Sequence, residues 1–229
     1  MPPLPVDMHS HLLPLLDDGA RSWEESLRLI QAFHAWGYQK VIVTPHIHPD
    51  FYPNTPEDIQ TRLAEWSTFL NEHRIPLRIE AAAEYFLSEH VSDLLAQNKP
   101  LLTFGHRYVL FEISHLQEPL SLKEFIFKAT TLGYQLVLAH PERYEFLSEE
   151  KLDDLRHRGV TLQINTMSLV GYYGKFAQKR AEYLIDRGYV SWLATDCHHV
   201  EHLPILEKAR QSNYYRKALS LPLLNHSLL

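Results

Sequence analysis

Short runs of apolar, β-branched residues alternate along the chain with longer stretches in which apolar residues recur every three or four positions. The short runs predict seven strands, over Pro5–His9, Lys40–Thr44, Leu77–Ala83, Tyr108–Glu112, Gln135–Ala139, Thr161–Asn165 and Val190–Thr195. The stretches between them predict helices. Strands that alternate with helices in this way are typical of an α/β domain with a parallel sheet, either a β/α barrel or a doubly wound sheet.

Several of the predicted helices have recognisable start and stop signals. Ser22 with Glu25, and Ser121 with Glu124, have the spacing of a capping box. Thr55 is a candidate N-cap because a proline follows it. The other predicted helices begin after Ser148 or cover Glu89–Gln97, Lys175–Arg187, Leu206–Ser212 and Tyr214–Leu219. The glycines expected to end helices in the left-handed conformation are Gly37, Gly133, Gly159 and Gly188.

Composition narrows the class of protein. No linker or low-complexity segment divides the 229 residues, so we expect a single domain over residues 1–229. The glycine-rich motifs of nucleotide-binding sheets are absent, and a net charge of -6 argues against nucleic-acid binding. No apolar run approaches the roughly 20 residues that span a bilayer, so we expect no membrane insertion. The start of the chain lacks the features of a signal peptide, and a single cysteine, Cys197, suits the cytoplasm, where we expect the protein to be located.

Fifteen histidines make this residue type unusually frequent, and many of them follow predicted strands. Six of the seven strands have a His, Asp or Glu at or just after the carboxyl end: His9, His11, His46, Glu84, Glu112, His140, Asp196 and His198. In a β/α barrel the carboxyl ends of the strands carry the active site. The sequence therefore predicts one cluster of these side chains.

Imidazoles and carboxylates without thiolates favour Mn²⁺, Fe²⁺ or catalytic Zn²⁺ over a closed structural zinc site. The set is larger than one ion requires, and clustered carboxylates repel one another unless cations lie between them, so we expect two or three ions. In an extended chain His9 and His11 share one face, as do Asp196 and His198, while Cys197 faces away and packs.

Arg143 follows the fifth strand in the segment "LVLAHPER" and can bind a phosphate through two parallel N–H groups. A metal cluster beside an arginine favours hydrolysis of a phosphoester. Without the arginine, hydrolysis of an amide would be equally well supported.

Each of these signals has an ordinary structural alternative. Asp17 and Asp18 before a glycine are typical of a turn. The charge of Glu84, beside apolar residues, needs either an ion or a salt bridge. Arg143 can instead pair at the surface with Glu142 or Glu145. Several aromatic residues near the predicted site loops either line a pocket or pack locally: Tyr52, Tyr85, Phe86, Tyr172 and Tyr173.

The segments "DMHSH", "DDG", "TPH", "AAAEY", "LFEIS", "LAHPERY" and "ATDCHH" resemble, in this order, the motifs of the PHP (polymerase and histidinol phosphatase) superfamily. They are most similar to its bacterial capsule and exopolysaccharide tyrosine-phosphatase branch, from Val6 to His202. The resemblance implies a distorted (β/α)7 TIM-like barrel with a metal cluster, usually manganese. It also implies a substrate, phosphotyrosine on the tails of bacterial tyrosine kinases.

The resemblance also implies a role for individual residues. The implied metal ligands are His9, His11, Asp18, His46, Glu84, Glu112, His140, Asp196 and His198. The implied catalytic residues are Arg143, which binds the phosphate, together with His140, Asp196 and His198. The chain departs from the family in "HHVEHLP", where a second arginine is usual; the candidates to replace it are His199, His202 and Lys175.

We therefore expect a metal-dependent phosphomonoesterase, a protein-tyrosine phosphatase. A covalent cysteinyl phosphate is not expected, because Cys197 lacks the Cys-x₅-Arg phosphate loop. Three alternatives stay open: a small-molecule phosphatase such as one for histidinol phosphate, a metal-dependent amidohydrolase, and a kinase-binding module without catalytic activity.

Overall fold

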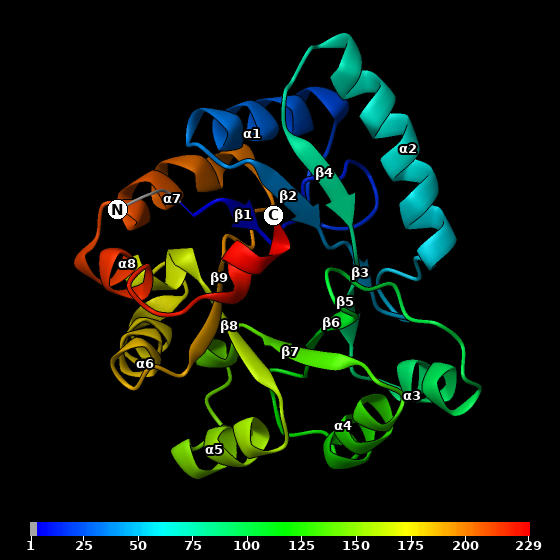
Figure 1. Cartoon of the computed structure of the whole chain (residues 1–229), viewed down its shortest axis with the longest axis vertical. Coiled ribbons are helices and arrows are strands. Elements are labelled where there is room, and N and C mark those ends of the chain that lie inside the picture. The colour runs from blue at the N-terminus through cyan, green and yellow to red at the C-terminus, as the bar shows by residue number, and fades with distance from the viewer. Residues whose placement is uncertain (1–3) are drawn as a thin grey trace.

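The computed structural model describes residues 4–229, which form two parallel sheets surrounded by helices (Figure 1). Residues 1–3, which belong to the segment examined for a signal peptide, lie outside the described residues. The first sheet has the order β1 (Val6–Asp7), β2 (Lys40–Val43), β4 (Arg78–Ala81). The second has the order β3 (His46–Ile47), β5 (Glu84–Phe86), β6 (Tyr108–Glu112), β7 (Gln135–Ala139), β8 (Thr161–Asn165), β9 (Val190–Ala194).

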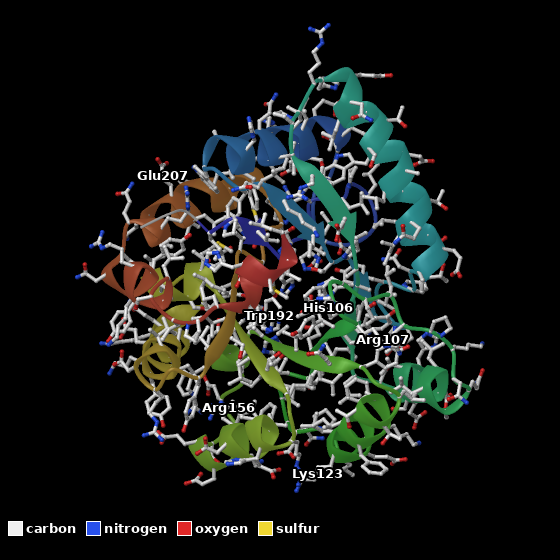
Figure 2. The ribbon with its side chains drawn as sticks, viewed as in Figure 1. His106, Arg107, Lys123, Arg156, Trp192 and Glu207 are labelled. Carbon is white, nitrogen blue, oxygen red and sulfur yellow. The ribbon has the colours of Figure 1, made fainter. Side chains whose placement is uncertain are left out.

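The helices lie around the outside of the strands (Figure 1). The α-helices are α1 (Trp23–Ala35), α2 (Pro56–Glu72), α3 (Glu89–Ala96), α4 (Leu122–Thr131), α5 (Glu149–His157), α6 (Gly174–Asp186), α7 (Leu203–Arg210) and α8 (Asn213–Ala218). Short 3₁₀ helices are η1 (Pro141–Arg143), η2 (Thr166–Val170), η3 (Val200–His202) and η4 (Leu224–Leu228). Figure 2 shows Lys123, Arg156 and Glu207 on outer helices and Trp192 among the strands. None of the helices in residues 4–229 combines the length and the apolar character that crossing a bilayer requires.

The nine strands within residues 4–229 form seven wall segments, because two of the segments each consist of two short strands. Residues 44–45 separate β2 from β3, and residues 82–83 separate β4 from β5. Pro45 has no N–H for the ladder, which explains one interruption. The two broken segments stay side by side, since the Ala82 amide donates to the Val43 carbonyl (2.9 Å) and the Glu84 amide donates to the Pro45 carbonyl (3.1 Å).

The first and last segments also meet, which closes the wall. Ser10 pairs in parallel with Cys197, and the His11 amide donates to the Cys197 carbonyl over 2.9 Å. The fold is therefore the distorted (β/α)7 barrel that the sequence predicts.

Side chains alternate along the strands between two apolar clusters. One cluster fills the inside of the barrel and includes Val6, Ile42, Leu110, Val137 and Trp192. The other lies between strands and helices and includes Val41, Phe111, Leu136, Leu162 and Leu193. Most strands are buried on both faces, although Arg78 and Glu80 of β4 are exposed, and the polar side chains inside the barrel lie toward the carboxyl ends.

The C-terminal helix η4 covers the other end of the barrel, in front of the strands in Figure 1. Asn225 joins β1 to β9 there: its Nδ2 donates to the carbonyls of Val6 (3.0 Å) and Leu193 (2.8 Å), and its Oδ1 accepts from the Leu193 amide (3.1 Å). The buried Lys40 ammonium donates to the Leu228 carbonyl (2.9 Å). The last residues of the chain therefore connect β1 to β9 at this end of the barrel.

The helix signals are confirmed in part. Ser22 accepts from the Glu25 amide, and Thr55 forms a full capping box with Asp58. The capping box predicted at Ser121 is wrong, because Ser121 already has helical backbone angles (φ -77°, ψ -7°) and makes no capping hydrogen bond. The four predicted helix-ending glycines all have positive φ.

Candidate metal centre and active site

A cavity of about 400 Å³ opens among the loops that follow the strands. Its lining consists of Asp18, His46, His48, Tyr52, Glu84, Glu112, His115, His140, Arg143, Tyr172, Tyr173, Asp196, His198, His199 and His202. Seven of the nine predicted metal ligands are among them. The other two, His9 and His11, are fully buried and contact this group from within the barrel.

Glu84, at the start of β5, lies at the centre of the cluster and is fully buried. Its Oε2 lies 3.2 Å from His9 Nε2, 3.4 Å from His11 Nε2 and 3.2 Å from His46 Nδ1. Its Oε1 lies 3.1 Å from His140 Nε2. One carboxylate therefore contacts four imidazoles from three different strand ends.

Asp196 and His198 reach the same cluster from the end of β9. Asp196 Oδ1 lies 3.4 Å from His9 Nε2 and 3.5 Å from His11 Nε2. The extended geometry predicted for this pair is wrong, because Asp196 has a φ of 51° and the chain turns there. His140 has a φ of 35° at the corresponding place after β7. Such left-handed residues outside glycine are uncommon and concentrate at functional sites.

Asp18 and Glu112 lie at the mouth of the cavity. Asp18 is half exposed, and its Oδ1 lies 3.6 Å from the Nε2 atoms of both His46 and His198. Glu112 Oε1 lies 3.2 Å from His46 Nδ1. Together the residues give three groups whose ligand atoms lie within 4.8 Å of one another: His11–Asp18–His46–His198, His9–His11–Asp196 and His46–Glu84–Glu112.

Three of the imidazoles are oriented by hydrogen bonds from Nδ1. His9 Nδ1 donates to Gln163 Oε1 (2.8 Å), His11 Nδ1 donates to Asp17 Oδ2 (2.7 Å), and His198 Nδ1 donates to the Asp196 carbonyl (2.9 Å). A proton held on Nδ1 leaves Nε2 as the lone pair for a metal, and metal-binding histidines are commonly fixed in this way.

The sequence predicted only a turn at Asp17 and did not single out Gln163. Gln163 lies on β8 two residues before Asn165, so both side chains face the inside of the barrel. The signal that could have identified Gln163 is therefore a polar residue at an inward position of a barrel strand.

The donor set fits divalent cations. His9 Nε2 and His11 Nε2 are only 3.2 Å apart, and both rings already donate from Nδ1. Two imidazole lone pairs at this distance repel unless a proton or a cation lies between them. The carboxylates of Glu84 and Asp196 lie against the same two nitrogens. Imidazole and carboxylate together suit Mn²⁺, Fe²⁺ or Zn²⁺.

The carboxylates change the proton affinity of the histidines. Burial alone would lower the pKa of His46, but Glu84 and Glu112 raise it to about 9. Burial alone would also lower the pKa of His11, but the neighbouring carboxylate of Asp17 outweighs burial and holds that pKa well above its ordinary value. Burial would raise the pKa of Glu84, but His9 and His46 hold it well below the usual range. The cluster therefore attracts positive charge strongly.

Arg143 forms the wall of the cavity beside this cluster. Its Nη1 lies 3.5 Å from Asp196 Oδ2, and its guanidinium lies 4.5 Å above the ring of Tyr173. The predicted alternative, a surface pair with Glu142, is wrong: Glu142 is buried and accepts from the Asn165 amide and the Ser168 hydroxyl. Arg143 is therefore available to a ligand in the cavity.

The remaining sequence candidates divide between cavity and core. Tyr52, Tyr172 and Tyr173 line the cavity, whereas Tyr85 is fully buried in the core. Phe86 packs locally, stacked on His48 with ring centroids 4.1 Å apart.

His115, which sequence reasoning missed, also lines the cavity. Its position three residues after Glu112, at a strand end, could have identified it. Of the candidates to replace the second arginine, His199 and His202 line the cavity, while Lys175 is exposed at the start of α6 and is not part of the lining.

Known proteins are similar to this chain over most of its length. The chain is 29% identical over 213 residues to the tyrosine-protein phosphatase YwqE of Bacillus subtilis (strain 168), with 89% of this chain and 84% of the relative covered. The chain also matches a crystal structure with a TM-score of 0.85 at 25% identity, over 98% of this chain and 94% of the other. That structure is one of those of YwqE from Bacillus subtilis and CpsB from Streptococcus pneumoniae, which are described as metal-dependent tyrosine phosphatases.

A histidinol phosphate phosphatase from Lactococcus lactis shares the fold, with a TM-score of 0.54 at 18% identity and 93% and 92% of the two chains covered. The resemblance predicted from the motifs is confirmed by the model of the family described as capsular polysaccharide synthesis, CpsB/CapC, which matches residues 5–219. The chain belongs to the CpsB/CapC family.

Proposed function

We propose that this chain, acting as a single domain, is a metal-dependent phosphatase that hydrolyses phosphotyrosine in proteins. The observation that carries the proposal is the position of Arg143 beside the imidazole and carboxylate cluster, both facing one cavity of about 400 Å³. An arginine matches the geometry of a phosphate, whereas an amide substrate gives it no comparable partner. The names of the relatives, tyrosine-protein phosphatases, support the same reaction.

The nine residues proposed to hold the metal are His9, His11, Asp18, His46, Glu84, Glu112, His140, Asp196 and His198. We propose two or three ions of Mn²⁺, with Fe²⁺ or Zn²⁺ as alternatives. When bound, the ions would supply positive charge to the phosphate oxygens and make a water molecule acidic enough to attack phosphorus. The carboxylate of Glu84, which contacts four imidazoles, would supply negative charge to the ions at the centre of this ligand set.

Arg143 would bind the phosphate oxygens that face away from the cluster and stabilise the charge that develops on them. Asp196 and the face of Tyr173 hold the guanidinium in position from two sides. Removing one such donor typically slows turnover by about 10²–10³-fold. We assign His140, Asp196 and His198 to the same reaction through their contacts with the cluster and with Arg143.

The natural substrate proposed here is a phosphotyrosine segment of a bacterial tyrosine kinase. Its support is the family description, capsular polysaccharide synthesis, together with a cavity that opens at the protein surface. Incubation of the protein with phosphorylated kinase, followed by detection of phosphotyrosine, tests it. Retention of the phosphate by the kinase while short phosphotyrosyl peptides are hydrolysed would contradict this choice of partner.

The activity is tested by elemental analysis of the purified protein, paired with hydrolysis assays in Mn²⁺, Fe²⁺, Zn²⁺ and Mg²⁺. We expect turnover of a phosphotyrosyl peptide, with histidinol phosphate and amides as poor substrates. Arg143→Ala and His140→Ala should fold normally and lose hydrolysis, and Arg158→Ala, which removes an exposed ion pair on Asp154, is the matched control. Preference for histidinol phosphate, or wild-type turnover in either site variant, would overturn the proposal.

A further inference from the structure

A second cavity of about 260 Å³ adjoins the first on the far side of Arg143. Its lining consists of His115, Arg143, Glu145, Tyr173, Phe176 and Ala177. Three of these residues, His115, Arg143 and Tyr173, also line the metal-side cavity. The two cavities therefore share a wall that contains Arg143, the arginine proposed to bind phosphate.

The size of the second cavity suits one side chain. Sites that hold a complete small ligand usually measure about 300–1,000 Å³. The second cavity is smaller than that range, and it has no counterpart of the metal cluster in its lining. In an extended peptide each residue advances the chain by about 3.3–3.6 Å. Because Arg143 lines both cavities, a residue next to a phosphotyrosine held by Arg143 is close enough to enter the second cavity.

The chemistry of the second cavity suits an uncharged aromatic side chain. Its walls are the rings of Tyr173, Phe176 and His115, and Phe176 is 42% exposed, which is unusual for a large aromatic residue. The two charged groups have opposite preferences. A cation would meet the guanidinium of Arg143, and an anion would meet the carboxylate of Glu145. An uncharged ring avoids both conflicts and gains contact with the aromatic walls.

We propose that the second cavity is a substrate subsite that takes an uncharged aromatic side chain adjacent to the phosphotyrosine. This inference rests on the proposed function, because it assumes a phosphotyrosyl peptide in the first cavity. In this proposal Phe176 and Glu145 determine which peptides bind, and neither residue contacts the proposed metal ligands. Small aryl phosphates do not extend past Arg143, so their hydrolysis should not depend on Phe176 or Glu145.

The test compares phosphotyrosyl peptides that carry Phe, Ala, Lys or Glu on either side of the phosphotyrosine. Wild-type protein should have the lowest KM for a Phe neighbour on one side. Phe176→Ala should raise that KM about 2- to 10-fold, the range expected for one lost aromatic contact, with kcat unchanged. Glu145→Gln should lower the KM for the Glu-containing peptide. Phe127→Ala, at an exposed phenylalanine on α4, is the matched control.

Calorimetry with the non-hydrolysable phosphonate analogues of the same peptides tests the subsite independently of turnover, and p-nitrophenyl phosphate hydrolysis tests the reaction independently of the subsite. Loss of affinity in Phe176→Ala for the Phe peptide, with p-nitrophenyl phosphate hydrolysis unchanged, supports the subsite. Equal affinity of wild type and Phe176→Ala for the Phe-containing analogue overturns it, as does an equal loss for the Ala and Phe peptides. Failure of the wild type to hydrolyse any aryl phosphate would instead overturn the proposed function.

Discussion

Gln163→Leu should weaken metal binding although Gln163 is not proposed as a ligand. Its Oε1 accepts from His9 Nδ1 (2.8 Å) and from the His140 amide (3.3 Å), so it fixes the histidines at two of the strand ends. Leucine has a similar size but no acceptor. In the variant, His9 can move its proton to Nε2, where the carboxylate of Glu84 accepts it, and that proton then blocks the position a cation would take.

The magnitude follows from the group that metal binding would leave without a partner. To bind a cation through Nε2, His9 in the variant must place its proton on Nδ1, which is fully buried and faces the leucine. A buried donor without an acceptor costs about 1–3 kcal/mol. That free energy corresponds to a loss of about 5- to 150-fold in metal affinity, which agrees with the 10–100-fold typical when such orienting partners are removed.

The measurement is competition of Mn²⁺ between the protein and a chelator of known affinity, together with thermal unfolding of the metal-free protein. Gln135→Leu is the control, because Gln135 also lies on a barrel strand but donates to the His106 carbonyl at the exposed end. Metal affinity in Gln163→Leu equal to that of Gln135→Leu would show that the hydrogen bond to His9 does not prepare the ligand.

Three further predictions concern pH and stability. Glu84 and Glu112 outweigh burial and raise the pKa of His46 to about 9, so below that pH a cation must displace a proton from His46 in order to bind. The Mn²⁺ affinity, measured by competition with a chelator, should therefore rise by up to about tenfold per pH unit between pH 7 and 9 and then level off. An affinity that does not change with pH would contradict this. Asn225→Leu leaves three buried backbone groups unpaired, at about 1–3 kcal/mol each, and should lower the unfolding temperature by at least about 2–4 °C per kcal/mol, whereas Asn213→Leu at the exposed start of α8 should change it little. Thr55→Ala should cost about 1 kcal/mol in urea unfolding and Ser121→Ala under about 0.5 kcal/mol, since only Thr55 caps its helix; equal costs would refute that difference.

The sequence predicted the strands best where both faces of a strand are buried. Tyr108–Glu112, Gln135–Ala139 and Thr161–Asn165 have the predicted bounds, because a continuous apolar run fills the inner and the outer cluster alike. The first three predicted strands were too long, because the structure has only Val6–Asp7, Lys40–Val43 and Arg78–Ala81 there. Strand pairing there depends on which carbonyl of the neighbouring strand each amide reaches, as where the Glu84 amide donates to the Pro45 carbonyl. A run of apolar residues does not contain that information. The capping box at Ser121 failed for a similar reason, since the spacing fits but the backbone is already helical.

The set of candidate site residues was predictable because strand order alone brings carboxyl ends together. Gln163 and His115 were missed since neither belongs to a ligand-like pair, although an inward position on a strand and a position just after a strand end could have identified them as candidates. The left-handed backbone at His140 and Asp196 was equally invisible. Both residues have side chains that reach the cluster only because the chain turns there, a geometry that favours glycine and that the sequence gives no reason to expect.

The carboxylate of Asp196 lies between the proposed metal ligands and Arg143, the residue proposed to bind phosphate. Its Oδ1 faces His9 and His11, while its Oδ2 accepts from Asn165 Nδ2 (2.6 Å) and lies 3.5 Å from Arg143 Nη1. A cation near Oδ1 would draw electron density from the carboxylate and weaken its attraction for the guanidinium. Arg143 would then be freer to bind an incoming phosphate, which brings its own negative charge. We therefore expect metal binding and phosphate binding to be coupled through Asp196, with the hydrogen bond from Asn165 holding its carboxylate in place.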